Sequence, residues 1–270
     1  MVRLKIKAKK LKRAISAVSS IVSMGNLHID EDKIKIRDLD LSHTCFVDLE
    51  INNEDFSSYE AEEEEDFMDL GNYMVPLNLR ELRDSIEPFP DDTLLVLGGS
   101  HKKDTLNISS IEDMFSVDID LLKVQHEGHD NWEPCVQLPL SFSLPITPLI
   151  RTIRHIGNSY ELEIQCHDGL VELHGRGGNL ESSLSLEVPS SSHIRNCIYP
   201  MKWFKKMIWG EEDISRPPMV RPAREIEFSI GYNAPLRLEF PLFGSDVSRV
   251  PGKSRIEYWV APRFREDLEQ

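Results

Sequence analysis

The sequence predicts an α+β fold built from two similar domains, and three observations lead to this. Its 270 residues suffice for two domains of ordinary size, and the hydrophobic share of 40% suffices for packed cores. The order of predicted helices and strands in residues 1–122 recurs in residues 138–270, which indicates an internal duplication. Residues 123–137, KVQHEGHDNWEPCVQ, are polar and are predicted to be an interdomain connector.

The first half is predicted to contain two helices among antiparallel strands. Residues 9–24 carry apolar side chains at helical spacing and are predicted to form the first helix. A second helix is predicted to begin at Pro76, because proline suits the first helical turn, and to run to Ile86. Strands are predicted at residues 28–30, 33–36, 44–51, 93–97, 104–109 and 114–121.

The second half repeats this order. Helices are predicted at residues 148–157 and from Pro200 to Trp209, and Asp168-Gly169 is a good hairpin turn. Strands are predicted at residues 161–166, 170–174, 179–188, 225–230, 236–241 and 255–260. Both helices of each half are expected to pack on one face of a sheet.

Composition limits where the protein works. No apolar run approaches the roughly 18 residues of a membrane-spanning helix, and the first five residues lack the apolar stretch of a secretory signal. Cys45, Cys135, Cys166 and Cys197 are scattered without CxxC spacing, so neither a zinc site nor a disulfide framework is indicated. We therefore expect a reduced, soluble, intracellular protein that does not associate with membranes.

No group of residues in the sequence predicts catalysis or cofactor binding. His126 and His129 lie in a polar loop without a suitably spaced third ligand, so no metal site is expected. The carboxylates include no isolated pair in an apolar setting, which acid–base chemistry would require. We find no credible nucleophile either, and we expect a protein that is not an enzyme and uses no cofactor.

The net charge of −15 argues against nucleic acid as a partner only if the charge is evenly spread. Residues 60–66, EAEEEED, concentrate acid in a predicted solvated loop, with a partner-docking segment as the alternative. Three of the four predicted helices are basic and free of acid. The basic residues of all four helices are Lys9, Lys10, Lys12, Arg13, Arg80, Arg83, Arg151, Arg154, Lys202, Lys205 and Lys206.

Residues three and four apart share a helical face, so Arg80/Arg83, Arg151/Arg154 and Lys202/Lys205/Lys206 each form one stripe, expected to face outward. Such stripes are typical of a surface that binds phosphates without reading bases. For a single helix, an ordinary solvated face is the favoured alternative. The recurrence of the pattern at four repeated positions favours DNA binding.

Five motifs, in order along nearly the whole chain, resemble the proliferating cell nuclear antigen (PCNA) family of DNA sliding clamps. Residues 39–47 are similar to its MDxSHVxLV segment, and Phe56 with Tyr59 to its F-x-x-Y. Residues 151–159 resemble the R-D-L-x-x-x-G-D-S helix end, residues 234–240 the PLxxEY strand, and residues 258–263 the YYLAPK/R end. Long segments at 60–66, 210–224 and 243–254 mark a diverged member, archaeal or viral in type.

The resemblance implies a clamp fold whose subunits join head to tail into a ring of three. The helices would line a hole that encloses double-stranded DNA without sequence preference, and a positive bore in a negative body would attract DNA only there. The ring would act as a processivity factor in replication and repair, in the cytoplasm and nucleoid or in the nucleus. The strands expected to meet between subunits contribute Met114, Ser116, Asp118, Leu180, Ser182 and Leu184.

Family members also bind partners through short hydrophobic peptides that lodge beneath the connector. The resemblance implies DNA polymerase, the clamp loader, nuclease and ligase as partners. The groove would comprise Leu39, His43, Thr44, Phe46, Leu121, Leu122, Val124, Pro235, Tyr258, Trp259, Ala261 and Pro262. Core filling is the alternative for each apolar member and is favoured for Phe46 and Tyr258. Trp259 is favoured for the groove, because aromatic residues often anchor interfaces.

Two other functions remain open. The chain is a candidate clamp paralogue that serves in a heterotrimer or in a damage-signalling clamp. It is also a candidate monomeric adaptor or inhibitor that keeps the clamp fold without closing a ring. The mass of the purified protein would separate a homotrimer from a monomer.

Overall fold

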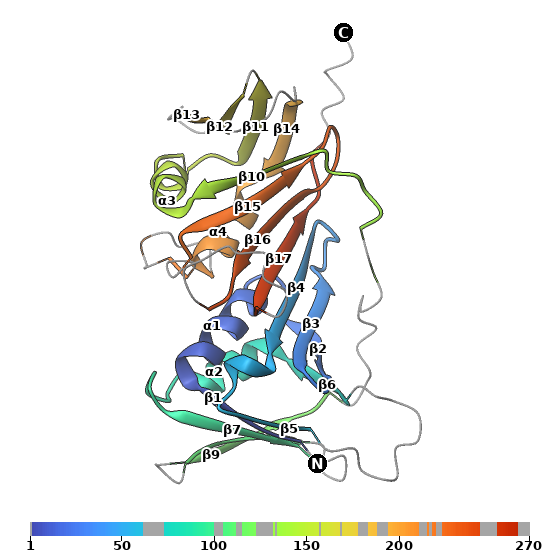
Figure 1. The fold of residues 1–270 in the computed structure, drawn as a ribbon, viewed down its shortest axis with the longest axis vertical. Helices are drawn as coiled ribbons and strands as arrows, with labels where there is room; N and C mark the ends of the chain where they lie inside the picture. Colours follow the sequence, from blue (N-terminus) through green and yellow to red (C-terminus); the bar gives the residue numbers. More distant parts are fainter. Residues whose placement is uncertain are drawn as a thin grey trace. The chain divides into compact units, whose positions relative to one another are not determined.

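The computed structural model confirms the α+β class, and Figure 1 shows its helices and strands. It describes residues 2–61, 73–99, 105–111, 115–122, 132, 134–156, 158–167, 169–177, 183–187, 194–210, 215, 218–219, 223–243 and 253–263. The chain forms two compact units. The first comprises Met1–Leu41, Val47–Asn131 and Arg249–Ile256, and the second comprises Ser42–Phe46, Trp132–Ser248 and Glu257–Gln270. Most of the predicted connector lies outside the described residues.

The first unit contains antiparallel strands in two groups. The order β5-β1-β7-β8-β9 joins β5 (Ser58–Ala61), β1 (Val2–Lys7), β7 (Leu94–Gly99), β8 (Thr105–Ser110) and β9 (Ser116–Asp120). The order β4-β3-β2-β6 joins β4 (Cys45–Asn52), β3 (Lys33–Leu39), β2 (Met24–Ile29) and β6 (Tyr73–Asn78). A short 3-10 helix, η1 (Asn53–Asp55), follows β4.

Helices α1 (Ala8–Ser19) and α2 (Leu79–Ile86) lie beside each other in the first unit (Figure 1). Leu11, Ile15 and Val18 follow the helical spacing of α1 and are buried. Strand β3 alternates buried and half-buried residues, and its apolar Ile34 and Ile36 are among the buried ones. Each such aliphatic side chain stabilises the fold by roughly 2 kcal/mol when it leaves water.

Among its described residues, the second unit likewise contains two groups of antiparallel strands and two α-helices. The order β13-β12-β11-β14 joins β13 (Ser183–Glu187), β12 (Leu170–Arg176), β11 (Glu161–His167) and β14 (Ile194–Pro200). The order β10-β15-β16-β17 joins β10 (Leu140–Pro145), β15 (Glu225–Ile230), β16 (Leu236–Pro241) and β17 (Arg255–Val260). Helices α3 (Ile146–His155) and α4 (Met201–Trp209) complete the unit and contact each other.

Every one of these helices begins with a backbone hydrogen bond to another segment. The first amide donates to a carbonyl oxygen at 2.8 or 2.9 Å: Ala8 to Thr93, Leu79 to Ser23, Ile146 to Arg224 and Met201 to Tyr160. In α2 the side chain of Asn78 also accepts from the amides of Arg80 and Glu81. The residues before α1, α3 and α4 make no side-chain cap of this kind.

The structure corrects several predicted boundaries. Pro76 does not open a helix but lies in β6, opposite Asn26 of β2, and α2 starts three residues later. A proline is tolerated there because β6 is the last strand in its group, where one missing amide disrupts no central ladder. Helix α1 ends at Ser19 rather than at residue 24. In the part of the chain that the structure describes, no helix is long and apolar enough to cross a membrane.

Candidate functional site

The cations of α1 differ in their surroundings. Lys9 is exposed. Nζ of Lys10 donates to Oδ1 and to the backbone oxygen of Asp55, at 2.6 and 3.0 Å. Nζ of Lys12 lies 3.5 Å from Oδ1 of Asp91, and the Lys12 side chain is largely buried. Helix α1 contains no acidic residue of its own, but carboxylates from distant segments of the chain pair with Lys10 and Lys12.

The other predicted DNA-facing residues of the first unit are Arg13 on α1 and Arg80 and Arg83 on α2. Arg13 is half-buried on α1, whereas Arg80 is exposed on the first turn of α2. The half-buried Arg83 is bonded to its neighbour Asp84, with Nη2 3.0 Å from Oδ1. Arg80 is thus the cation of α2 that is more open to a ligand.

Helices α3 and α4 present cations in the second unit. Arg151, Arg154 and Lys202 are exposed, and Lys205 and Lys206 are half-buried. Apolar side chains such as Ile153 and Phe204 form the opposite, buried faces. The basic and apolar residues of each helix therefore separate as the sequence predicts.

Two tryptophans of α4 lie under these cations. Nζ of Lys202 and Nζ of Lys206 lie 4.4 and 5.1 Å from the ring centroid of Trp203, and the Arg154 guanidinium carbon lies 5.9 Å from that of Trp209. Such contacts attract a cation to the ring face. Sequence reasoning missed both tryptophans, although the spacing of one and three residues between Trp203 and its lysines was a usable signal.

The predicted subunit-contact residues lie on two strands at the ends of their sheets. β9 is an end strand of the sheet β5-β1-β7-β8-β9, and its Ser116 and Asp118 are exposed. Oδ1 of Asp118 accepts a hydrogen bond from Nδ2 of Asn107 at 2.7 Å. β13 is likewise the last strand of its order and contains Leu184. The other three predicted contacts, Met114, Leu180 and Ser182, lie outside the described residues.

Eight of the predicted groove residues belong to the second unit, where they form two layers. Phe46 and Tyr258 are 1% and 0% exposed, so they lie in the core. The half-buried layer comprises Thr44, Pro235, Trp259, Ala261 and Pro262, and we call it the C-terminal strip. His43 is exposed beside it with φ 54°, and the amide of Ala261 donates to the oxygen of Thr44 at 2.8 Å.

A tryptophan of the predicted connector packs against this region. The ring centroids of Trp132 and Phe46 are 4.5 Å apart. Trp132 was predicted only as part of the connector, and its place in the sequence carries no signal for the contact, because Phe46 is remote along the chain. It adds an aromatic side chain to the surroundings of the C-terminal strip.

The other predicted groove residues belong to the first unit. Leu39, Leu121 and Leu122 are half-buried there, and the amide of Leu122 donates to the oxygen of Pro76 at 3.0 Å. Val124 lies outside the described residues.

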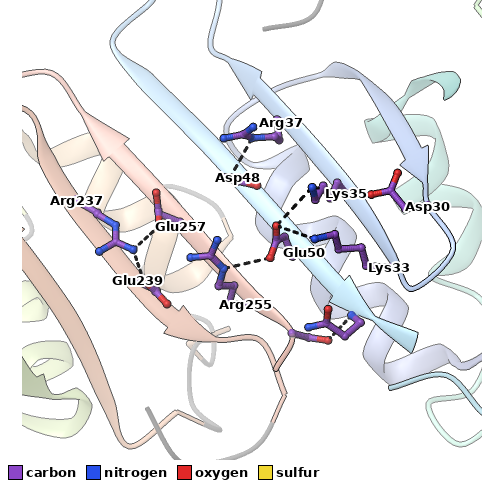
Figure 2. Close-up of polar contacts among 12 residues, drawn as sticks. Asp30, Lys33, Lys35, Arg37, Asp48, Glu50, Arg237, Glu239, Arg255 and Glu257 are labelled. Carbon is purple, nitrogen blue, oxygen red and sulfur yellow. Dashed lines mark hydrogen bonds and ion pairs between the residues drawn. The ribbon is translucent and has the colours of Figure 1, made fainter. Parts of the chain in front are cut away.

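A charged network adjoins the C-terminal strip within the second unit. Figure 2 shows Arg237 of β16 pointing toward Glu239 and toward Glu257 of β17. Nη2 of Arg237 lies 2.6 Å from Oε2 of Glu257 and also donates to Glu239. Burial lowers the pKa of Arg237, but the hydrogen bond and the attraction from Glu257 outweigh it and raise the pKa overall. Nε1 of Trp259 donates to Oε1 of Glu257.

The described residues include no group of three or more His, Cys, Asp or Glu side chains placed to hold a metal ion. His126 and His129 lie outside those residues.

Comparison with known proteins finds a family match in the first half of the chain and distant relatives along its whole length. Residues 1–120 match the family described as "Proliferating cell nuclear antigen, N-terminal domain". A protein of Methanocorpusculum labreanum named "DNA polymerase sliding clamp" is 22% identical over 277 residues, covering 99% of this chain and 100% of that protein. A protein of the same name from Methanoculleus marisnigri is 23% identical over 274 residues, with the same coverage.

The first 120 residues thus match the PCNA N-terminal domain, and the whole chain is similar to archaeal sliding clamps.

Solved PCNA structures agree with this fold over 97–99% of the chain. The PCNA of Entamoeba histolytica superimposes with a TM-score of 0.77 at 17% identity, covering 97% of this chain and 99% of that one. The structure titled "C-terminal region of FEN-1 bound to A. fulgidus PCNA" gives 0.79 at 16% identity, covering 99% and 100%. A PCNA2–PCNA3 complex from Sulfolobus tokodaii gives 0.76 at 15% identity, covering 97% and 99%.

Proposed function

We propose that this chain is a subunit of a DNA sliding clamp, a ring that encloses duplex DNA and tethers polymerase and other replication and repair proteins. The observation that carries the proposal is a set of exposed cations on helices that recur in both halves of a chain with net charge −15. The set comprises Lys9, Arg80, Arg151, Arg154 and Lys202. The half-buried Arg13, Arg83, Lys205 and Lys206 extend it, whereas Lys10 and Lys12 are engaged by acids.

Cations on helical faces suit a protein that slides along DNA. Contacts to phosphates carry no sequence information, so each step along the duplex meets the same charges. A negative body repels DNA elsewhere, and the positive helices become its favoured surface. The clamp would act inside the cell, wherever the genome is replicated, and its role in the proposal is binding rather than catalysis.

Ring closure is proposed to use the two end strands β9 and β13. An unpaired strand edge exposes a row of amides and carbonyls, and a second subunit can continue the sheet there. Such a contact is heterologous, since different surfaces of identical chains meet, and it closes into a ring when the rotation is right. Ser116, Asp118 and Leu184 lie on these strands, and Met114, Leu180 and Ser182 are proposed to take part in the same subunit contacts.

Partner binding is proposed to use the C-terminal strip. Its half-buried apolar residues offer contact area to a short hydrophobic peptide, and Trp259 is the largest of them. The PCNA bound to the C-terminal region of FEN-1 supports this class of partner. By analogy we propose DNA polymerase, the clamp loader, nuclease and ligase as the proteins that supply such peptides.

The DNA-facing assignment is tested by charge reversal. Arg151→Glu together with Lys202→Glu should reduce polymerase processivity on primed circular DNA at least tenfold, because each reversal replaces phosphate attraction with repulsion. Arg3→Glu together with Lys253→Glu is the matched control, since both cations are exposed and lie off the helices. Equal loss in the two double variants, or no loss in the first, would contradict the assignment.

A heterotrimeric clamp is the second candidate, supported by the similarity to a complex of two PCNA paralogues. Light scattering on the purified chain separates the possibilities. A homotrimer has a mass of about 93 kDa, three times the 31.0 kDa of the chain. A 31.0 kDa species at micromolar concentration would contradict the homotrimer and direct attention to partner subunits or to a monomeric adaptor.

A further inference from the structure

The side chain of Trp259 is held by the charged network described above. Glu257 and Trp259 are two residues apart on β17, so strand alternation puts both side chains on one face. The two oxygens of the Glu257 carboxylate have different partners, because Oε1 accepts from Nε1 of Trp259 and Oε2 accepts from Arg237. The carboxylate thus links the guanidinium to the indole.

Arg237 also contacts the indole ring directly. Its guanidinium carbon lies 5.9 Å from the ring centroid of Trp259, within the range of a cation–π contact. Glu239, on the same strand as Arg237, binds the guanidinium as well. Two carboxylates therefore hold Arg237, and Arg237 together with Glu257 restrains the ring through its face and its N–H.

The side chain of Glu257 is 11% exposed, and the side chain of Arg237 is 24% exposed. A carboxylate at this depth loses much of its hydration, so it depends on its hydrogen-bond donors. The indole N–H is one of those donors. Rotation of Trp259 away from the strip would break that bond, and this disfavours other rotamers.

We propose that Glu257 and Arg237 are positioning residues, which fix Trp259 in its partner-binding orientation before any peptide arrives. The inference rests on the proposed function of the C-terminal strip and adds how that strip is prepared. A side chain that is already ordered loses less rotamer freedom on binding, and this makes the complex tighter.

The same arrangement determines what Trp259 offers to a partner. Its N–H donates to Glu257, so a partner acceptor must displace the carboxylate to reach it. Arg237 lies over the ring, so a partner contacts the remaining ring surface. The position therefore selects an apolar or aromatic side chain of the peptide over a hydrogen-bond acceptor.

A double-mutant cycle tests the coupling between Glu257 and the indole. The affinity of a fluorescent peptide from the C-terminal region of FEN-1 is measured for the full chain, for Glu257→Leu, for Trp259→Phe and for both changes together. Glu257→Leu should weaken binding about three- to tenfold when Trp259 is present, the range expected for one immobilised side chain. It should weaken binding less than twofold after Trp259→Phe, since phenylalanine has no N–H to hold.

Glu239→Gln is the matched control. It removes one carboxylate from Arg237 and leaves the acceptor of Trp259 in place, so it should change affinity less than twofold. The inference is overturned if Glu257→Leu costs the same factor in both backgrounds, or if Glu239→Gln reproduces its effect. Absence of peptide binding by the unaltered chain would instead overturn the proposed use of the strip.

Hydrogen exchange tests the positioning of Trp259 without any peptide. It therefore distinguishes a failure of the positioning inference from a failure of the proposed peptide binding. The indole N–H signal of Trp259 is assigned by its loss in Trp259→Phe. It should exchange with deuterium at least tenfold faster in Glu257→Leu than in the unaltered chain, because the bonded state is lost. If Glu257→Leu does not fold, Glu257→Gln keeps the side-chain shape, weakens the acceptor and should accelerate exchange about threefold. Unchanged exchange in the folded variant would overturn the inference even if peptide binding is strong.

Discussion

The ammonium of Lys10 lies 2.6 Å from Oδ1 of Asp55, which makes this lysine of α1 part of the scaffold rather than part of the open basic surface. Lys10→Met should lower the free energy of unfolding by about 1 kcal/mol, since a half-buried charged hydrogen bond is lost. Lys9→Met, the matched change at an exposed neighbour, should leave stability nearly unchanged. Urea denaturation measures both.

The same two variants should rank in the reverse order in their effect on DNA binding. Lys9→Met should reduce the salt dependence of clamp retention on DNA, whereas Lys10→Met should have a smaller effect because Asp55 already neutralises that charge. Retention on nicked circular DNA across a salt series reports this. A larger change with Lys10→Met than with Lys9→Met would contradict the assignment of Lys10 to the scaffold.

Arg37 and Asp48 form a more deeply buried pair in the first unit (Figure 2). Nε of Arg37 lies 3.1 Å from Oδ2 of Asp48, whose side chain is 8% exposed. Arg37→Met should destabilise the chain by about 3 kcal/mol, because a buried carboxylate loses its cation. Adding Asp48→Leu should recover most of that loss, and thermal unfolding would show it. A double variant as unstable as Arg37→Met would show that the charge is not the cause.

Gly175 in β12 is required by a close approach. A Cβ at this position would lie 2.5 Å from Cβ of Ile156 and 2.6 Å from Oγ of Ser159. Gly175→Ala should therefore cost about 1–3 kcal/mol, as overpacking does when the neighbouring atoms cannot move. Gly25→Ala is the control, since its Cβ would meet the end of the Leu79 side chain at 3.2 Å. Comparison of their urea midpoints tests the contrast, and equal midpoints would refute it.

The four cysteines should differ sharply in reactivity. Cys135 is exposed, whereas Cys45, Cys166 and Cys197 are buried. Burial raises the pKa of Cys166 to about 12, with a further contribution from Cys197. The thiolate is the reactive form, so the buried thiols should stay inert at pH 8. Ellman's reagent should label one thiol per folded chain and four in guanidinium, and Cys135→Ser should remove the fast phase. Rapid labelling of a second thiol would contradict the burial.

Local sequence patterns predict much of this fold. The alternation around Ile34 and Ile36 and the helical spacing of Leu11, Ile15 and Val18 depend on which side of an element faces the core. Pro76 was misleading because proline suits both a first helical turn and a strand at the end of a sheet. Which of these applies depends on the neighbouring strand, and a local pattern does not contain that information.

The candidate DNA-binding and peptide-binding surfaces were predictable only where they depend on spacing within one element. The exposure of Arg151, Arg154 and Lys202 follows from the spacing of charges within one helix. Asp55 and Asp91, which engage Lys10 and Lys12, lie 45 and 79 residues further along the chain. The contact of Trp132 with Phe46 is similarly distant in sequence, and that of Arg237 with Glu257 joins two strands 20 residues apart. Such partners come together only through tertiary structure, so the sequence pattern could not reveal them.

The backbone hydrogen bonds at the helix starts bear on how far such a chain can diverge. Each first amide, at Ala8, Leu79, Ile146 and Met201, is bonded to a carbonyl that any residue type would supply. The starts of α1, α3 and α4 then need no capping side chain, so substitutions before them should be tolerated, whereas α2 also uses Asn78. This helps explain how 15–17% identity to solved relatives coexists with TM-scores of 0.76 to 0.79. Surface chemistry can drift in such a lineage while the scaffold persists.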